Sequence, residues 1–263
     1  MHKVLIGIGT CDKFAYCEKY VLEAAHNQTF KDFDVLILDN SKTSTYSAIL
    51  QAKYPWATVK HLGSRPKYFR DATGQSRKAV VDYAVSHGYE YLFFLDADFI
   101  IKPNTLEKLM SHNVDFVTTV VGYMHHHLNE TTCFIKNHDK NIRSKIPGLP
   151  GVKALLYPEV DSLPELSEIV FCGLSCALIK VKFLYGTAFY VSHLNQSFLE
   201  DVIFIRDIRR KGAHIWLDRT LKPMHLHVGM QERQFRAEKG VKYINGQQLK
   251  VEHGRNPISK GAV

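Results

Sequence analysis

Short apolar runs alternate with longer amphipathic stretches through the first 120 residues. Val4–Ile8 and Val35–Leu38 are runs of strand length, rich in β-branched residues. The stretch between them repeats apolar residues at the spacing of one helical face, from Phe14 to Ala24. The pattern therefore predicts a strand, a helix and a second strand in that order.

The same alternation continues to residue 121. Asp71 is a candidate N-cap for a helix that runs to about His87, and Gly88 is its stop signal. The other predicted elements are strands at 58–62, 91–95 and 116–121 and helices at 46–53 and from 104. Strands that alternate with helices predict an α/β fold, a mostly parallel twisted sheet with helices on both faces, as in Rossmann-like domains.

Polar residues follow three of the predicted strands directly. They are Thr10, Asp39 and Asp96. Ligands of such sheets bind beyond the carboxyl ends of the strands. The three residues are therefore expected to share one site.

Regular periodicity fails between residues 122 and 168. This stretch contains His125–His127 and a Pro- and Gly-rich segment, and we interpret it as a long loop. Regular structure is expected again at 169–182, in a helix at 198–211 and in short strands at 214–217 and 224–228.

Composition indicates an ordinary globular chain. The 263 residues suffice for one large domain, and 45% of them are hydrophobic. No apolar run approaches the roughly 20 residues of a membrane span. The five cysteines show neither a zinc-binding nor a disulfide spacing, so we expect them to be reduced. We expect a cytoplasmic protein, with a peripheral position at a membrane surface as the alternative.

Positive charge is concentrated at the C-terminal end. Nine Lys or Arg and three Glu follow from Arg219 onward, which places +6 of the net charge of +8 there. We expect a domain at 1–228 and a basic extension at 229–263. Such an extension attracts phosphate groups of a nucleotide, a nucleic acid or a lipid surface; the alternative is a solvated tail without a partner.

Asp96 and Asp98 bracket one residue at the end of the apolar run YLFFL. Two carboxylates so placed can hold Mn²⁺ or Mg²⁺ together with the oxygens of a diphosphate. A solvated turn in which one acid caps the next helix is the alternative. Haloacid-dehalogenase-like phosphatases also have an Asp-x-Asp pair, but on their first core strand, whereas here about 90 residues precede it.

Two segments resemble the GT-A glycosyltransferases of family two. VLIGIGTCDKFAYCEKYVLEAAHNQTFKDFDVLILDNS at 4–41 resembles the opening of that family. ATGQSRKAVVDYAVSHGYEYLFFLDADF at 72–99 resembles its Gly-x-x-x-Arg helix and the Asp-x-Asp strand that follows. A weaker similarity continues through FCGLSCALIK and FLEDVIFIRDIRRKG. The resemblance implies a GT-A-like fold.

The resemblance also implies roles for the residues at the strand ends. Thr10 and Asp39 would lie against the nucleoside, and Arg77 would approach the base or the diphosphate. Asp96 would lie near the ribose and the metal, and Asp98 would be the main metal ligand. An exposed helix residue at Arg77 and a turn-forming Asp39 are the alternatives.

Acceptor activation is assigned to two acids in the first turn of the predicted helix at 198–211. Ser197 followed by Glu200 is a capping box, which gives Glu200 a structural task. The resemblance implies that the Glu200–Asp201 pair supplies the base that deprotonates the acceptor hydroxyl, and we choose Asp201 as this base, with Glu200 near the acceptor. Stabilisation of the helix dipole by both acids is the alternative. Gly173 and Leu174 are expected under the acceptor site, where a glycine lets a substrate approach the backbone; a tight core turn is the alternative for this segment.

His225 and His227 alternate along a predicted strand, so both imidazoles would point to one side. Some GT-A enzymes use a late histidine as a third metal ligand, and mixed His and carboxylate ligands suit Mn²⁺. Ordinary surface histidines are the alternative.

The expected function is metal-dependent transfer of a sugar from a nucleotide diphosphate sugar to an acceptor hydroxyl, with inversion. The acceptor could be a glycan, a lipid-linked molecule or a polyanion such as nucleic acid. The alternatives are a nucleotidyltransferase and a non-catalytic protein that binds nucleotide sugars or nucleic acid.

Overall fold

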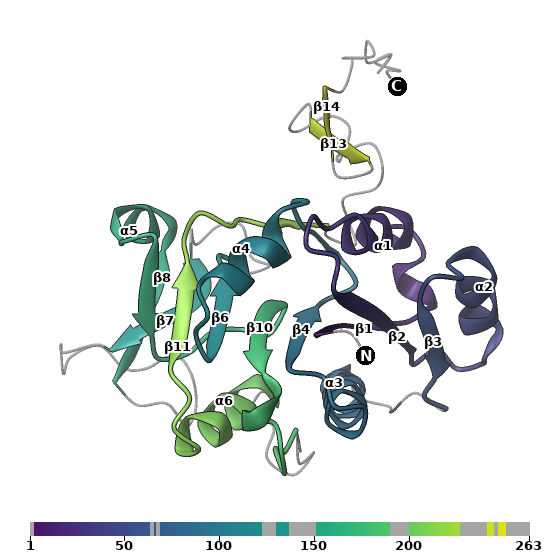
Figure 1. Ribbon diagram of the computed structural model, residues 1–263, viewed down its shortest axis with the longest axis horizontal. Helices are drawn as coiled ribbons and strands as arrows, with labels where there is room; N and C mark the ends of the chain where they lie inside the picture. The colour runs from purple at the N-terminus through teal and green to yellow at the C-terminus, as the bar shows by residue number, and fades with distance from the viewer. Residues whose placement is uncertain are drawn as a thin grey trace, which may run out of the picture.

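The computed structural model describes most of the chain (Figure 1). Described are residues 3–63, 66, 69–122, 130–136, 151–189, 200–226, 241–244 and 247–250. The predicted metal ligand His227 lies outside these ranges, and so do His125–His127 of the predicted loop.

An eight-stranded sheet forms the centre of the described structure, in the order β3-β2-β1-β4-β10-β6-β11-β9. β3, β2, β1 and β4 are parallel to one another, and β6 is parallel to β11. β10 runs antiparallel to β4 and β6, and β9 runs antiparallel to β11. The predicted mostly parallel sheet is therefore confirmed. The strands are β1 (Val4–Thr10), β2 (Phe33–Asp39), β3 (Thr58–His61), β4 (Tyr91–Leu95), β6 (Phe116–Thr119), β9 (Leu166–Ile169), β10 (Cys176–Lys180) and β11 (Ile215–Asp218).

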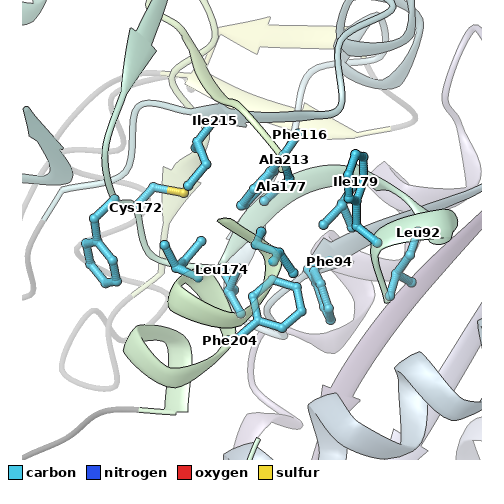
Figure 2. Packing of buried hydrophobic residues seen from close by; sticks show 14 of the residues in the cluster. Leu92, Phe94, Phe116, Cys172, Leu174, Ala177, Ile179, Phe204, Ala213 and Ile215 are labelled. Carbon is cyan, nitrogen blue, oxygen red and sulfur yellow. The ribbon is translucent and has the colours of Figure 1, made fainter. Parts of the chain in front are cut away.

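Helices cover both faces of the sheet, as the alternating pattern predicted. One half of the core lies under α1 (Glu18–His26), α2 (Thr45–Lys53) and α4 (Thr105–Ser111). The other half lies under α3 (Phe69–Ser86) and α6 (Glu200–Arg210). Figure 2 shows this second half, where Phe204 of α6 meets Phe94 of β4 edge to face at 5.7 Å between ring centroids. All five cysteines are buried thiols that form no disulfide.

The prediction of a loop at 122–168 was wrong for its described part. Strands β7 (Glu130–Lys136) and β8 (Val152–Leu156) form an antiparallel pair, and α5 (Tyr157–Ser162) follows. Only alternate residues of the first half of β7 are buried, and a shift in register interrupts the pairing. Short, irregularly paired elements of this kind leave no sustained period in the sequence.

The start of one helix differs from the predicted one, and the predicted start of another lies outside the described ranges. Asp71 lies inside the first turn of α3 rather than at its cap, because the helix begins at Phe69. α6 is described from Glu200, and Ser197 lies outside the described ranges, so the capping box is untested.

The basic C-terminal part is described only as a β-hairpin of β13 (Val241–Ile244) and β14 (Gln247–Lys250). The boundary between a domain at 1–228 and an extension at 229–263 therefore stays a prediction. Within the described ranges, no helix is both long and apolar enough to cross a membrane.

Two glycines in β1, Gly7 and Gly9, let α3 approach the sheet closely. A Cβ atom at Gly7 would lie 2.2 Å from Cγ1 of Val80. We expect Gly7→Ala to lower the free energy of unfolding by about 1–3 kcal/mol, the usual effect of overpacking a core. Urea denaturation measures this loss. In a Val80→Ala background the same substitution should cost much less, and an equal loss in both backgrounds would contradict the steric explanation.

Candidate active site

A cleft opens at the carboxyl ends of β1 and β4, beside α3. It is lined by Thr10, Asn40, Ser76, Arg77, Asp96 and Asp98, among others. Four of these six are residues that the sequence singled out at strand ends and on the following helix. The structure places Thr10 and Asp96 in one cleft with Arg77 and Asp98, whereas Asp39, which was expected to share a site with Thr10 and Asp96, does not line it.

Asp39 lies behind the cleft rather than in it. Its carboxylate is fully buried, and Oδ1 accepts hydrogen bonds from the backbone N–H (2.8 Å) and the hydroxyl (2.5 Å) of Ser41. Oδ2 lies 3.4 Å from Nδ1 of His61 at the end of β3. Oδ2 makes no hydrogen bond within the described residues, and the role of Asp39 against the nucleoside stays a prediction.

Asn40 was missed in the sequence and lines the cleft instead. Its Nδ2 donates to the hydroxyl of Ser76 at 3.0 Å, and its buried Oδ1 has no hydrogen-bond partner among the described residues. Asn40 could have been found in the sequence from its position, because it directly follows β2, whose carboxyl end lies at this edge of the sheet. An unpaired buried amide oxygen can accept a hydrogen bond from a ligand.

Arg77 joins two carboxylates that are far apart in the sequence. Nη1 donates to Oε1 of Glu200 at 2.5 Å, and Nη2 donates to Oδ1 and Oδ2 of Asp96 at 3.1 and 3.2 Å. Burial alone would lower the pKa of Arg77, but the charges of Asp96 and Glu200 outweigh it and raise that pKa above its ordinary value. We call Arg77, Asp96 and Glu200 the Arg77 bridge. It connects α3, the end of β4 and the start of α6.

A two-stranded ribbon brings His225 to Asp98. Strand β12 (Met224–His225) pairs with β5 (Phe99–Ile100), and the N–H of Leu226 donates to the carbonyl of Asp98 at 2.7 Å. The His225 ring stacks on Phe99, and its Nε2 lies 3.2 Å from Oδ2 of Asp98. Burial raises the pKa of Asp98, and His225 opposes this shift in part.

The chemistry of Asp98 and His225 fits a divalent cation. A largely buried carboxylate with a raised pKa gains from a nearby positive charge, and a carboxylate oxygen beside an imidazole nitrogen is a donor set that suits Mn²⁺. Asp96 is turned to Arg77 with both oxygens. Its predicted role as a further metal ligand stays a prediction.

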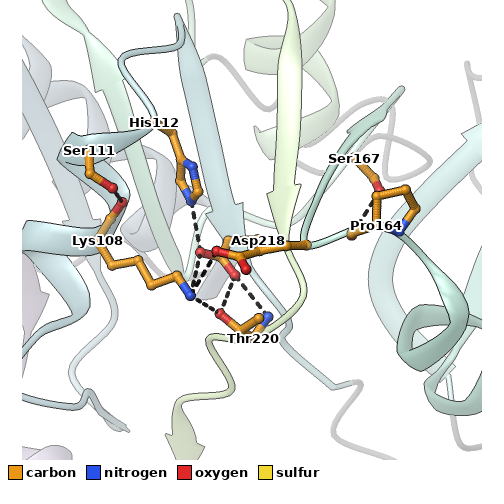
Figure 3. Close-up of polar contacts among 8 residues, drawn as sticks. Lys108, Ser111, His112, Pro164, Ser167, Asp218 and Thr220 are labelled. Carbon is orange, nitrogen blue, oxygen red and sulfur yellow. Dashed lines mark hydrogen bonds and ion pairs between the residues drawn. The ribbon is translucent and has the colours of Figure 1, made fainter.

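A second polar cluster lies at the carboxyl end of β11 (Figure 3). His112, Glu165 and Asp218 form the one group of three in the described chain whose ligand atoms lie within 4.8 Å of one another. The Lys108 ammonium lies 3.0 Å from Glu165 and 3.8 Å from Asp218 and supplies the positive charge that these acids need. Hydrogen bonds of Asp218 to Thr220 and His112 lower the pKa of Asp218 despite its burial. We interpret the cluster as a structural network.

Asp201 lies in the first turn of α6, next to Glu200. Its Oδ1 is buried without a hydrogen-bond partner in the described part of the chain. Burial, and then the negative charge of Glu200, raise the pKa of Asp201 to about 7, although Arg77 opposes the shift. A carboxylate with a pKa near the working pH is suited to act as a general base.

The residues expected near the acceptor are less accessible than the sequence suggested. The Leu174 side chain is fully buried in the core cluster of Figure 2. The N–H of Gly173 donates to the carbonyl of Thr132 at 3.2 Å, and the carboxylate of Glu200 belongs to the Arg77 bridge. The whole Leu174 residue is 0% exposed, so the expectation that it contacts an acceptor was wrong.

Comparisons with known proteins agree with this architecture. A family model described as glycosyl transferase family 2 matches residues 17–185, more than half of the chain. No curated protein matches the chain.

Solved structures are similar at low identity. TarS of S. aureus is 15% identical with a TM-score of 0.52, over 88% of this chain and 38% of that one. TarS 1-349 in complex with UDP-GlcNAc is 16% identical with a TM-score of 0.51, over 82% and 55%. The chain thus spans well under two thirds of these TarS structures. A197 from STIV is 14% identical over 99% and 100% of the two chains, with a TM-score of 0.45.

Proposed function

Because the chain belongs to glycosyl transferase family 2, we propose that it transfers a sugar from a nucleotide diphosphate sugar to an acceptor hydroxyl, with a divalent cation and with inversion. The observation that carries this proposal is the cleft lined by Arg77, Asp96 and Asp98. His225 lies beside Asp98 as a candidate second ligand for a cation, and Asp201, the candidate base, follows Glu200, which accepts a hydrogen bond from Arg77. Family membership argues against the nucleotidyltransferase and non-catalytic alternatives.

Donor binding is assigned to the carboxyl ends of β1, β2 and β4. Thr10 and Asn40 line the cleft with polar atoms for the nucleoside, and Asp98 with His225 would hold the cation. Bound Mn²⁺ or Mg²⁺ would neutralise negative charge on the departing diphosphate. Arg77 keeps the Asp96 carboxylate neutralised, so that it does not repel the diphosphate.

Acceptor activation is assigned to Asp201. The acceptor oxygen forms a bond to the anomeric carbon while the bond from that carbon to the diphosphate oxygen breaks. The hydroxyl proton passes to the Asp201 carboxylate, and the nucleoside diphosphate leaves with the electron pair. Attack from the face opposite the leaving group inverts the anomeric carbon.

The substrates are proposed from charge and from similarity. A uridine donor is the first to test, because a TarS structure contains UDP-GlcNAc. The nine Lys and Arg from Arg219 onward, against three Glu, favour an acceptor with negative charge. That acceptor would be a charged glycan, a lipid-linked phosphate or another polyanion.

Release of nucleoside diphosphate tests this function. We expect the protein to cleave one of the UDP-, GDP-, CDP-, ADP- and dTDP-sugars slowly with water as acceptor when Mn²⁺ is present. EDTA should stop the release, and added Mn²⁺ should restore it. Cleavage that is equally fast in EDTA would remove the cation from the proposal, and no cleavage of any of the five would count against transfer itself.

A further inference from the structure

The start of α6 contacts α3 through Glu200, which accepts a hydrogen bond from Arg77. Gly74 lies beside this contact: a Cβ atom there would lie 3.7 Å from Cβ of Glu200, an ordinary contact distance, and only 2.8 Å from the carbonyl oxygen of Phe189, which precedes α6 in the chain. Gly74 and Arg77 are three residues apart, so they lie on the same face of α3.

From this geometry we propose that Glu200 is a positioning residue: through Arg77 it fixes Asp201 at the start of α6 relative to Asp96 at the donor side of the cleft. The proposal rests on the proposed function in one respect, the role of Asp201 as the base. It replaces the expectation that Glu200 contacts the acceptor.

The side chain of Glu200 is committed to Arg77. Glu200 is only 7% exposed, and its Oε1 accepts a hydrogen bond of 2.5 Å from the guanidinium. A charge-assisted hydrogen bond of this kind is roughly twice as strong as a neutral one. If Glu200 contacted an acceptor hydroxyl, that contact would compete with its hydrogen bond to Arg77. Asp201 would give up no such bond, because its buried Oδ1 has no hydrogen-bond partner among the described residues.

The guanidinium suits the bridging task for a geometric reason. Its planar group presents donors in fixed directions, so that Nη1 and Nη2 reach Glu200 and Asp96 at the same time. An ammonium group is a point charge without this fork. The distance between the donor motif and the base is therefore set by one rigid group.

The bridge also controls the charge around Asp201. The groups that face Asp201 are Glu200 on its own helix, Arg77 on α3, Asp96 after β4 and Cys172 before β10. Glu200 raises the pKa of Asp201 and Arg77 lowers it. Neutralising Glu200 removes a neighbouring negative charge and leaves Arg77 in place, so the pKa of Asp201 should fall.

Carboxyl NMR titration tests the electrostatic part of the proposal without donor or acceptor. Protein labelled with ¹³C at Asp carboxyls is titrated as wild type and as Glu200→Gln, and Asp201→Asn assigns the signal. We expect the titration midpoint of Asp201 to fall by about 1 pH unit or more in Glu200→Gln, the size typical of one close charge. An unmoved midpoint would overturn the proposal, since a purely structural role for Glu200 leaves it unchanged.

Amide hydrogen exchange tests the positioning part. Glu200→Gln keeps an oxygen that accepts from Arg77, whereas Glu200→Ala keeps none. We expect faster exchange in the first two turns of α6 in Glu200→Ala and near wild-type exchange in Glu200→Gln. Equal exchange in wild type and Glu200→Ala would overturn the proposal. If Glu200→Ala does not fold, Arg77→Lys gives the same comparison. Neither measurement uses a nucleotide. A protein that does not bind the proposed donor would therefore still give the expected results if Glu200 positions Asp201.

Discussion

Asp201→Asn should reduce sugar transfer by about 10²–10⁴-fold, the usual contribution of a general base. Asn is nearly isosteric with Asp but cannot accept the acceptor proton. Nucleotide binding should stay within a few-fold of wild type, because the residues proposed to hold the cation are Asp98 and His225, and Asp201 is not among them. The measurement is kcat with the best nucleotide sugar, together with the Kd of its nucleoside diphosphate in Mn²⁺.

The same variant should be more stable than wild type at pH 8, which separates lost chemistry from lost folding. The pKa of Asp201 is raised from 3.8 to about 7 by burial and by Glu200. The native state therefore keeps a proton that the unfolded state releases, so wild-type stability falls as the pH rises through this window. Asn resembles the protonated form, and its advantage should disappear below pH 4. Loss of both activity and stability at pH 8 would contradict this assignment.

The pKa of Asp201 also predicts the pH dependence of the wild type. The base works only when ionised, so kcat should rise with pH to a plateau above about 7. A rate that is already constant at pH 5 would exclude Asp201 as the titrating base.

Asp98→Asn should abolish the cation-dependent part of nucleotide binding. Asp98 is the acid that lies beside His225, and an amide oxygen carries no net charge to attract the cation. In wild type, nucleotide at 100 times its Kd should add about 2.7 kcal/mol of stability. In Asp98→Asn most of this increase should be lost in the presence of Mn²⁺. Thermal unfolding with and without Mn²⁺ measures it.

Asp82→Asn is the matched control for this prediction. Asp82 is an exposed acid on α3 that pairs with Lys78 four residues away, outside the cleft. The Asp82→Asn substitution changes the net charge by the same amount as Asp98→Asn. It should leave the increase in stability on nucleotide binding in Mn²⁺ intact. If both variants lose the effect equally, general charge rather than a cation at Asp98 explains it.

Local patterns predicted the sheet and the edge that holds the cleft. The apolar runs at Val4–Ile8, Val35–Leu38 and Tyr91–Leu95 each became a parallel strand, because the period of side chains and the turn residues after them are local properties. Their carboxyl ends meet at one edge in any such sheet. Thr10 and Asp96 could therefore be placed together without knowledge of the tertiary structure.

The pairing of Arg77 with Glu200 could not be predicted in this way. The two residues are separated by 123 positions, and nothing in either segment indicates that α6 docks on α3. The capping-box pattern instead suggested a local task for Glu200. Gly74 gave a partial signal, because a glycine inside a helix often marks a close backbone approach, here to Phe189. The buried placement of Asp39 depends on His61 and Ser41 and was equally hidden.

Binding of nucleoside diphosphates is the measurement that tests the central claim most directly. Thermal unfolding of the wild-type protein is followed with UDP, GDP, CDP, ADP and dTDP, each with and without Mn²⁺. The account predicts that one of them raises the unfolding temperature in Mn²⁺ and has little effect in EDTA. If none of the five does so at any Mn²⁺ concentration, the cleft beside Asp96 and Asp98 is not a cation-dependent donor site, and the proposed transfer reaction is contradicted.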